Sequence, residues 1–544
     1  MSCLRDRRLS SESVSSRCAP HIDDFIFDLY QNPETEKLSL STLLKSLNES
    51  GIRHDDPRLA DFLQAIREED KKHFNPDSII AAPITEHLDR EMFKRCVGDA
   101  IGIISKALKK QLVIPDWLAF STIVGEVFDS CTDVNEGHVA NYIPQLARSD
   151  PNYWAMSVCT VDGQRRSWGD TKISFCLQSV SKPFTYAIVL DELGAEEVHK
   201  YVGQEPSGRL FNDIALNHNG KPHNPMVNAG AILIASLMRR YGTLADRFDF
   251  ALQYFKRFAA GGYVGFNNAV FLSERDTADR NYALSYYMRE HKCFPPDTNL
   301  QDNMDLYFQL CSIETDVETL AVMAATLANG GVSPFSEERV VCNRAVRDTL
   351  SLMYSCGMYD YSGQFAFKVG LPAKSGVSGD MIIVVPNVMG ICLFSPALDS
   401  LGNTVRGVKF AEQFVEKFNF HNYDSLVYSE TYKIDPRKRI REARHESVSN
   451  MMYAATSGDI SSIQRYLLLG VSIYERDYDD RTVLHVAAAQ GNNNVLKFLL
   501  QRWYENPGPL DRYGRTPLDD AKEFSQTKCV ELLEEAMEDY ELKH

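Results

Sequence analysis

The stretch "FCLQSVSKPFTYAIVLDEL" (Phe175–Leu193) places a serine three residues before a lysine and then continues as an apolar segment. Proline is tolerated only in the first turn of a helix, so Pro183 predicts a helix that begins near Ser179. Residues three apart lie on one helix face, which would make Ser179 and Lys182 neighbours. The stretch therefore has two interpretations: a nucleophile at the positive helix end with a buried lysine as its base, or a helix-capping serine followed by a lysine whose charge reaches water.

The Ser-x-x-Lys spacing alone does not decide between these interpretations, because it occurs again at Ser525 and Lys528. A second feature is Lys374-Ser375-Gly376, which lies on a predicted strand within "GLPAKSGVSGD". Serine acyl enzymes with Ser-x-x-Lys also carry a Lys-Thr-Gly strand beside the active site. This second motif shifts the balance toward serine acyl transfer, and both interpretations of Ser179 stay open at this point. A Ser-Asp-Asn equivalent is not evident, which argues against a true β-lactamase.

The spacing of apolar, charged and turn-forming residues divides the 544-residue chain into a tail, three folded regions and a linker. Residues 22–115 have apolar positions three and four apart and are predicted to be helical. From 137 to 423, strand-like runs such as "WAMSVCTVDG" and "FAFKVGLPAKSG" alternate with helix-like runs such as "AGAILIASLMRRYG" and "TLAVMAATLANGG", which predicts a mixed α/β domain. The run "MIIVVPNVMGICLF" is interrupted by Pro386 and Asn387 and is predicted to form two buried strands around a turn.

The two ends of the chain have their own signatures. Helix pairs like those of 22–115 can resemble a degenerate EF-hand, but "NESGIRHDDPRL" lacks the spaced ligands of a calcium loop, so we expect a packing or assembly region. Residues 424–446 are charged and are predicted to be a linker or an exposed helix. Residues 447–540 repeat at offsets of 33 and 34, and "TVLHVA" matches the ankyrin core with one change, so three stacked helix pairs are predicted.

Composition excludes several classes of function. The formal net charge of -16 argues against an extended nucleic-acid surface. No uninterrupted apolar run approaches the ~20 residues of a membrane helix. The 12 cysteines form no Cys-x-x-Cys pair and the 13 histidines no zinc motif, so we expect reduced thiols and no metal or cofactor. Residues 1–18 have the Arg and Ser content of a mitochondrial transit peptide, but two acids interrupt them, and a disordered tail over 1–21 is the alternative.

Beyond these motifs, the sequence resembles the serine-dependent glutaminases, specifically the animal phosphate-activated ones in their long form. The blocks that carry the resemblance are "YIPQLAR", "VCTVDGQR", "FCLQSVSKP", "KPHNPMVNAGA", "SERDTADRNYA", "LYFQLCSIE", "VMAATLANGG", "SLMYSCGMYDYSGQFAF" and "GLPAKSGVSG". They cover nearly all of 137–423 in one order. The resemblance implies an α/β (α+β) fold with a β-lactamase-like or penicillin-binding-like domain, in which an antiparallel sheet carries a helical lobe, and it implies hydrolysis of L-glutamine to L-glutamate and ammonia.

The resemblance also implies the roles of individual residues. Ser179 is the nucleophile and Lys182 its base, Tyr359 helps to move the proton, and Tyr142 contacts the reacting region. The backbone N–H groups of Ser179 and Val377 form the oxyanion hole. The substrate-binding positions are Ser179, Asn228, Glu274, Asn281, Tyr307, Tyr359 and Val377, with Glu274 suited to pair with the α-ammonium and the amides and phenols suited to the remaining polar groups of glutamine. Taken singly, each of these residues also has an ordinary structural explanation.

Further properties follow only from the resemblance. They are activation by inorganic phosphate, a homotetramer with higher assemblies conceivable, and a mitochondrial location, with the cytoplasm as the alternative. The ankyrin module is expected to bind protein. Val180 and Ser181 stand where vertebrate forms read Cys-Val, and Ser181 should point away from the face shared by Ser179 and Lys182. The loop-like segment 208–224 is predicted to be a mobile gate that couples assembly to activity.

Two other hypotheses remain. The chain could be an acyl hydrolase of the same chemistry that acts on another amide, which a screen of asparagine and β-lactams against glutamine would separate. It could also be an ankyrin scaffold with an inactive enzyme domain. The presence of Ser179, Lys182, Tyr359 and Glu274 argues against the scaffold hypothesis.

Overall fold

The structure, a computed structural model, describes residues 22–32, 35–72, 87–208, 213–427, 432–438, 440–468, 471–503 and 505–543. At its centre lies a five-stranded antiparallel sheet in the order β5-β4-β11-β10-β9. The strands are β4 (Ala155–Thr160), β5 (Arg165–Gly169), β9 (Ala373–Ser375), β10 (Asp380–Val385) and β11 (Met389–Phe394). The prediction of two buried strands around a turn is confirmed by β10 and β11, whose turn includes Asn387 with a φ of 61°.

Alternating side chains give the sheet two buried faces. Along β10, Ile382 and Val384 belong to one hydrophobic core and Met381, Ile383 and Val385 to another. The first core includes residues of α15 (Val317–Ala328), which packs on the sheet so closely that a Cβ on Gly390 would lie 2.2 Å from Ala325 N. The second core is completed by α6 (Trp117–Ser130) and α18 (Val405–Lys417). The sheet is therefore covered on both sides, and α6, which precedes residue 137, is part of that cover.

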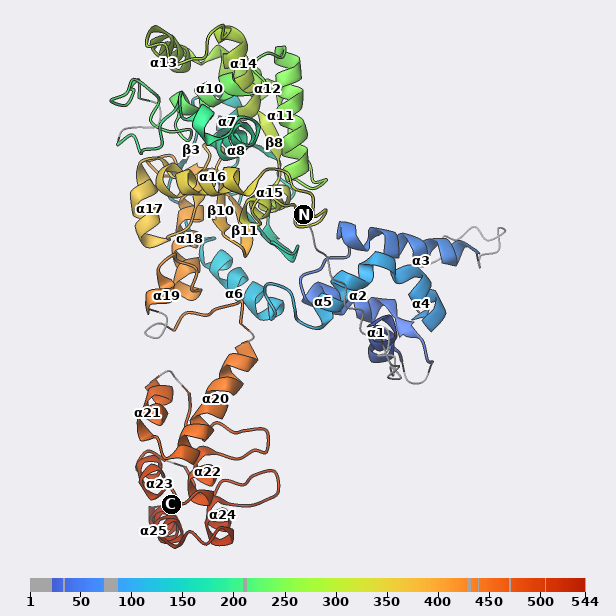
Figure 1. Ribbon diagram of the computed structural model, residues 1–544, viewed down its shortest axis with the longest axis vertical. Helices are drawn as coiled ribbons and strands as arrows, with labels where there is room; N and C mark the ends of the chain where they lie inside the picture. The colour runs from blue at the N-terminus through green and yellow to red at the C-terminus, as the bar shows by residue number, and fades with distance from the viewer. Residues whose placement is uncertain are drawn as a thin grey trace, which may run out of the picture.

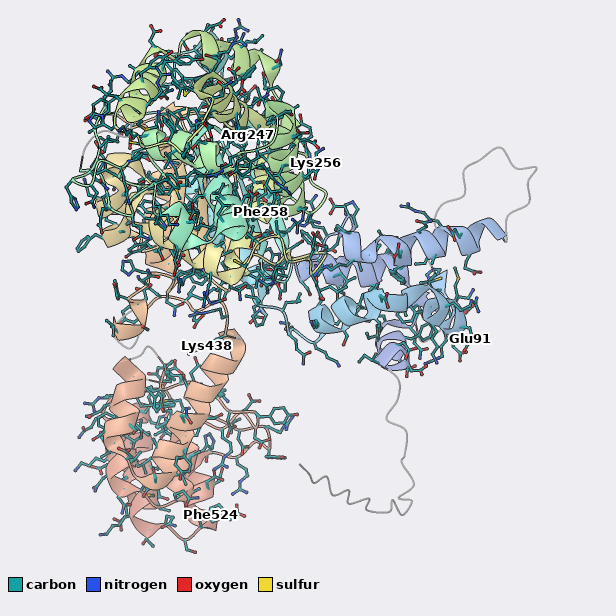
Figure 2. All side chains as sticks on the ribbon, turned by 45° about the horizontal axis from the view of Figure 1, so that its top comes forward. Glu91, Arg247, Lys256, Phe258, Lys438 and Phe524 are labelled. Atoms are coloured by element: carbon teal, nitrogen blue, oxygen red, sulfur yellow. The ribbon has the colours of Figure 1, made fainter. Side chains whose placement is uncertain are left out.

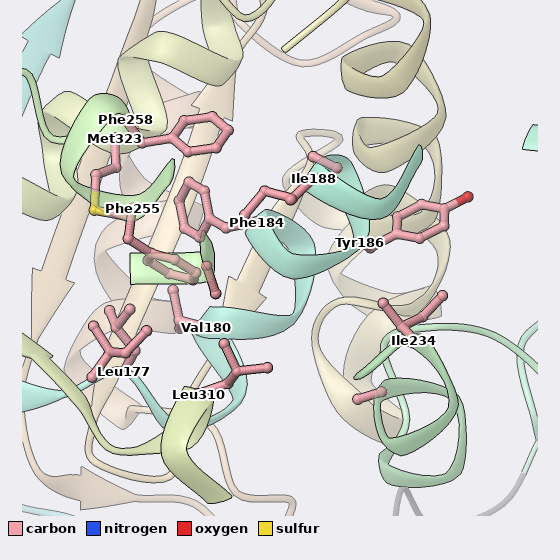
Figure 3. Packing of buried hydrophobic residues seen from close by; sticks show 14 of the residues in the cluster. Leu177, Val180, Phe184, Tyr186, Ile188, Ile234, Phe255, Phe258, Leu310 and Met323 are labelled. Carbon is pink, nitrogen blue, oxygen red and sulfur yellow. The ribbon is translucent and has the colours of Figure 1, made fainter. Parts of the chain in front are cut away.

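A helical lobe continues the first core, above the sheet in Figure 1. Figure 3 shows Phe184 of α8 pointing toward Phe255 and Phe258 of α11, with ring centroids 5.8 and 5.2 Å apart. Tyr186 points the other way in the same figure, and its hydroxyl lies 2.9 Å from His199 Nε2. The helices of this domain besides α6, α15 and α18 are α7 (Pro144–Ala147), α8 (Ser181–Leu193), α9 (Ala195–Val198), α10 (Asn228–Leu237), α11 (Leu244–Phe258), α12 (Asn268–Asp276), α13 (Asp279–Glu290), α14 (Leu300–Cys311), α16 (Asn343–Cys356), α17 (Ser362–Lys368) and α19 (Asp424–Val427).

One expected strand differs from the structure. The run "FAFKVGLPAKSG" was predicted to be strand-like throughout, and this is wrong for its first half, because Phe365–Lys368 closes helix α17. Phe365 and Val369, four residues apart, enter the core, whereas Phe367 is exposed. The alternating pattern therefore marks one buried turn of helix, and the strand is confined to β9. The helices expected for "AGAILIASLMRRYG" and "TLAVMAATLANGG" are confirmed by α10 and α15.

The N-terminal helices form a separate body beside the central domain (Figure 1). Their elements are α1 (Ile22–Tyr30), β1 (Leu38–Ser39), α2 (Leu40–Glu49), η1 (Pro57–Leu59), α3 (Ala60–Lys72), β2 (His87–Leu88), α4 (Arg90–Val97), η2 (Gly98–Ala100) and α5 (Ile101–Leu108). The loop after α2 touches the central domain: Gln164 Nε2 donates to Ser50 O at 2.9 Å, and Arg53 pairs with Glu318 of α15 at 3.1 Å. The loop that would hold calcium in an EF-hand thus forms a contact between domains.

The C-terminal helices stack as three pairs below the central domain (Figure 1). They are α20 (Ile440–Ser457) with α21 (Ile460–Leu468), α22 (Val483–Ala489) with α23 (Asn493–Leu500), and α24 (Pro517–Glu523) with α25 (Thr527–Lys543). Thr482 caps α22 together with His485. Part of the stretch 424–446 belongs to neighbouring elements: Lys433 pairs with Asp424 of α19 at 2.7 Å, and α20 begins at Ile440. Figure 2 places Lys438 between the central domain and the C-terminal repeats. It places Phe524 in the repeats and Glu91 in the N-terminal helices.

Candidate active site

A second, small sheet sets the position of Ser179. Its order is β6-β8-β7, with β8 (Ile313–Thr315) between β6 (Phe175–Cys176) and β7 (Gly265–Phe266). Leu177 N donates to Ile313 O at 2.8 Å, and the chain then forms the 3-10 turn η3 (Gln178–Val180) that leads into α8. On the other side of β8, β7 leads into α12, which carries Glu274. The one strand β8 therefore fixes the distance between the nucleophile segment and Glu274.

Ser179 and Lys182 are in direct contact. Lys182 Nζ lies 2.8 Å from Ser179 Oγ and 2.8 Å from Asn228 Oδ1, and Lys182 is 3% exposed. Burial lowers the pKa of Lys182 from 10.5 to about 8, although the negative charge of Glu274 acts against this shift. A lysine with a pKa of about 8 is neutral in roughly a tenth of the molecules at pH 7 and in half of them at pH 8, and the neutral form can accept a proton from the serine hydroxyl.

Tyr359 adjoins the same pair. It begins η4 (Tyr359–Tyr361), is buried, and has a φ of 54°, a left-handed conformation that is rare for a tyrosine. Burial raises its pKa, and the neighbouring Ser179 side chain opposes that shift. Backbone strain of this kind persists where the surrounding structure enforces it, and it is common at functional sites. A protonated tyrosine beside Ser179 can give and recover a proton.

Glu274 is held by two side chains at the opposite end of the site. Tyr142 OH donates to Glu274 Oε1 at 2.5 Å, and Gln178 Nε2 donates to the same oxygen at 2.9 Å. Glu274 Oε2 accepts no hydrogen bond from a described residue. Burial raises the pKa of Glu274, whereas these two hydrogen bonds and the charge of Lys182 lower it. The residue Tyr142 is 49% exposed while its hydroxyl reaches inward, so it forms the outer wall of the site.

These residues enclose a cavity of about 250 Å³. Of the residues predicted from the sequence, Tyr142, Ser179, Asn228, Glu274, Asn281, Tyr307 and Val377 all line it, while Lys182 and Tyr359 lie next to Ser179 in its wall. Asn228 Nδ2 donates to Asn281 Oδ1 at 3.1 Å, which joins the first turns of α10 and α13. A larger surface hollow of about 680 Å³, between α8, α10 and α11, contains none of these residues.

The sequence did not point to Gln178 or Arg280, which also line the cavity. Gln178 has a φ of 45°, so the residue before the nucleophile is strained as well. It stands inside the quoted block "FCLQSVSKP", but no residue pattern distinguishes a strained glutamine from an ordinary one. Arg280 brings a positive charge to the same cavity as the carboxylate of Glu274. The cavity therefore offers one charge of each sign, which suits a small zwitterion.

Two other sequence predictions fall near the site. Ser181 Oγ donates to Gln178 O at 2.7 Å, so it points away from the pair of Ser179 and Lys182 as expected. Of the segment 208–224, residues 209–212 lie outside the described residues. The remainder is tied by several hydrogen bonds, including Asn224 Nδ2 to Glu205 O at 2.9 Å and Lys221 Nζ to His199 O at 3.1 Å. Whether this segment acts as a gate stays a prediction.

The described part of the chain lacks a cluster of metal ligands, a disulfide and a helix that could cross a membrane. Within the described ranges, no group of three or more His, Cys, Asp or Glu side chains is arranged to hold a metal ion. The ten cysteines of the described part form no disulfide with one another. No helix in the part of the chain that is described has the length and apolar character needed to cross a membrane.

An antiparallel sheet with a helical lobe, and a Ser-Lys contact at the start of a buried helix, define a hydrolase of the β-lactamase-like fold. The chain belongs to the glutaminase family, whose model matches residues 137–423, and it is a glutamine amidohydrolase that forms glutamate. Models of an EF-hand domain and of three ankyrin repeats match residues 22–115 and 451–544.

Individual relatives agree with this assignment. "Putative glutaminase 3" of Caenorhabditis elegans is 61% identical over 540 residues, which are 99% of this chain and 92% of the relative. "Glutaminase liver isoform, mitochondrial" of Rattus norvegicus is 47% identical over 531 residues, 98% of this chain and 86% of the relative. Among solved structures, "Probable glutaminase ybaS" is 36% identical with a TM-score of 0.53, covering 55% of this chain and 96% of that chain. The likeness to that structure is confined to about half of this chain.

Proposed function

We propose that the chain hydrolyses L-glutamine through a glutamyl-enzyme intermediate on Ser179, with Lys182 as the general base. The observation that carries this proposal is the 2.8 Å contact between Lys182 Nζ and Ser179 Oγ. Ser179 Oγ attacks the side-chain amide carbon of glutamine and gives its proton to Lys182. The negative charge that develops on the amide oxygen is held by the backbone N–H groups of Ser179 and Val377, donors that typically contribute ~3 kcal/mol each.

Lys182 and Tyr359 also carry the protons in the two remaining steps, which are the release of ammonia and the hydrolysis of the ester. The tetrahedral intermediate collapses, the C–N bond breaks, and the nitrogen leaves as ammonia with the proton that Lys182 held, passed on by Tyr359. Water then attacks the ester carbon and gives one proton to the Lys182 and Tyr359 pair, which returns it to Ser179 Oγ as glutamate leaves. The buried, protonated state of Tyr359 supports this role.

Substrate recognition follows from the charges of the cavity. Glu274 Oε2 pairs with the α-ammonium of glutamine, because Oε1 is already occupied by Tyr142 and Gln178. Asn228, Asn281 and Tyr307 donate to the α-carboxylate and the amide. Tyr142 acts through Glu274 rather than on the reacting carbon.

The assembly and regulation of the protein are proposed by analogy with its relatives. We propose a homotetramer that inorganic phosphate activates, a mitochondrial location as printed in the name of the rat relative, and a protein ligand for the ankyrin module. Sedimentation and ammonia release, each with and without phosphate, test assembly and activation together. Activation without a change in sedimentation would separate phosphate binding from assembly.

Trapping the intermediate tests the mechanism. The enzyme is mixed with glutamine, quenched in acid within the first turnovers, and digested for mass spectrometry. We expect a glutamyl group on the peptide that contains Ser179, and faster release of that group when hydroxylamine is added as a second nucleophile. The Ser525→Ala variant, which removes the other Ser-x-x-Lys serine, should give the same labelled peptide. Full turnover with no acyl peptide and no hydroxamate would contradict the covalent mechanism.

A further inference from the structure

Asp380, the first residue of β10, is an acid buried without an evident partner. It is 0% exposed, and its carboxylate oxygens accept no hydrogen bond from any other described residue. A Cβ built on Gly376 would lie 2.1 Å from Asp380 Oδ1 and 3.0 Å from Leu177 O, so the carboxylate occupies the space beside the segment that enters the nucleophile turn. A carboxylate in such a place must lose its charge or face a cation.

The geometry of the strands supplies the cation. Lys374 of β9 pairs with Ile382 of β10, and alternate residues of a strand point to the same face. Lys374 and Asp380 are therefore diagonal neighbours on one face of the β9–β10 ladder, although the described structure shows no hydrogen bond between the lysine and the carboxylate. Lys374 is 0% exposed, its Nζ donates to Ser375 O at 2.6 Å, and it lies 4.4 Å from the centroid of the Tyr359 ring.

Each of these two groups favours the charge of the other. Burial, and after it the charge of Lys182, lower the pKa of Lys374, whereas Asp380 raises it. Burial raises the pKa of Asp380, whereas its own backbone N–H and Lys374 lower it. The remaining titratable side chains that interact electrostatically with the pair are Lys182 of α8, Tyr359 of η4, Cys356 of α16, Cys176 of β6 and Cys392 of β11. Asp380 is the one carboxyl group in this set.

We propose that Asp380 is the counter-ion of Lys374 and that this pair keeps the positive charge on Lys374, which favours the neutral form of Lys182, the base. The proposal rests on the proposed role of Lys182. Because two neighbouring positive charges repel each other, a state in which only one of the two buried lysines is charged is more favourable than a state in which both are. Lys374 has the carboxylate of Asp380 on the same face of its ladder. The direct partners of Lys182 are the uncharged oxygens of Ser179 and Asn228, and the carboxylate that favours its charge, Glu274, is already held by Tyr142 and Gln178. Lys374 and Asp380 are thus positioning residues that act through Lys182 and Tyr359.

A stability cycle tests the pair itself, without reference to catalysis. Asp380→Asn and Lys374→Met each leave one buried group without its partner, and the double variant removes both. We expect each single variant to lower the melting temperature of the full chain and the double variant to regain most of that loss. Losses that simply add in the double variant would overturn the proposed pair.

The pH profile tests its consequence. In Asp380→Asn, Lys374 gives up its charge, so Lys182 is no longer repelled and the acid limb of kcat/KM moves to higher pH by about one unit. Lys374→Met should give the same shift, and the double variant no further shift. The control Asp424→Asn breaks the ion pair between the buried Asp424 and the partly exposed Lys433, so it should lower the melting temperature and leave the acid limb in place.

The outcomes separate this inference from the mechanism on which it rests. If the acid limb of kcat/KM lies at the same pH in the wild type and in both single variants, the pair of Lys374 and Asp380 does not act on Lys182. In that case Lys182 remains the base and the inference is overturned. Retained turnover in Lys182→Met overturns the mechanism instead. If the acid limb of kcat/KM moves in Asp380→Asn and the stability losses are non-additive, both the inference and the mechanism are supported.

Discussion

Lys182 Nζ lies 2.8 Å from Ser179 Oγ, and both side chains are buried where η3 passes into α8. The relationship is local, since it needs only the one-turn spacing of two residues and a helix start. The groups that make this contact reactive come from distant parts of the sequence. Asn228 of α10 accepts a hydrogen bond from Lys182, and the hydrophobic side chains shown in Figure 3 keep water from helix α8.

Replacing the lysine should be nearly as damaging as replacing the serine. We expect Lys182→Met to lower kcat by on the order of 10⁴-fold, and the double variant with Ser179→Ala to be no slower than either single variant, because the members of one catalytic unit are not additive. Ammonia release measures both. Lys528→Met, in the second Ser-x-x-Lys, is the matched control and should keep wild-type activity.

The pH dependence of the reaction should report the lysine. Because burial lowers the pKa of Lys182 to about 8, the base is neutral above that pH and protonated below it. We expect kcat/KM to rise with pH by about tenfold per unit up to pH 8 and then to level off. A profile that is flat from pH 6 to pH 9, measured with full saturation of any activator, would not agree with a lysine base.

Removing the charge of Glu274 should weaken glutamine binding. We expect Glu274→Gln to lose about 1.5–3 kcal/mol of binding free energy, seen as a higher KM, because it removes the partner of the α-ammonium. Glu314→Gln is the matched control: Glu314 also accepts from a tyrosine and an amide, Tyr263 at 2.9 Å and Asn267 at 2.8 Å, but does not line the cavity.

An analogue of glutamine without the α-amino group sharpens this test. The analogue should inhibit the wild type and Glu274→Gln with similar affinity, since it lacks the group that Glu274 binds. An equally large loss of affinity for the analogue would mean that Glu274 acts by holding Tyr142 and Gln178 in place.

Two substitutions at Gln178 separate its hydrogen bonds from its backbone strain. Gln178→Ala and Gln178→Gly both remove the amide that donates to Glu274, so both should raise KM by about tenfold. The glycine variant accommodates the φ of 45° and should be more stable than the alanine variant by about 1–2 kcal/mol. Calorimetry on the two variants measures the difference in stability, and steady-state kinetics measures the change in KM. Equal stability of the two variants would mean that the turn relaxes.

Sequence and structure agree best where one element decides the outcome. The helix after Ser179, the strands β10 and β11 and the capped repeat at Thr482 follow from periodicity, proline and turn residues within each segment. Phe365–Lys368 could not be assigned in this way, because Phe365 and Phe367 alternate as in a strand, whereas the helix buries Phe365 and Val369 and leaves Phe367 exposed.

The site was predictable only in part. The resemblance singled out Glu274 and Asn281, and the structure brings them to one cavity with Ser179. The positive φ of Gln178 and Tyr359 and the orphan carboxylate of Asp380 arise from packing between elements, so no local pattern announces them.

The most direct test of the mechanism is the rate of ammonia release from glutamine by Ser179→Ala, measured beside Ser525→Ala on protein shown by circular dichroism to be folded. The mechanism predicts a loss on the order of 10⁴-fold or more for Ser179→Ala and wild-type turnover for Ser525→Ala. Near-wild-type ammonia release by folded Ser179→Ala would contradict it.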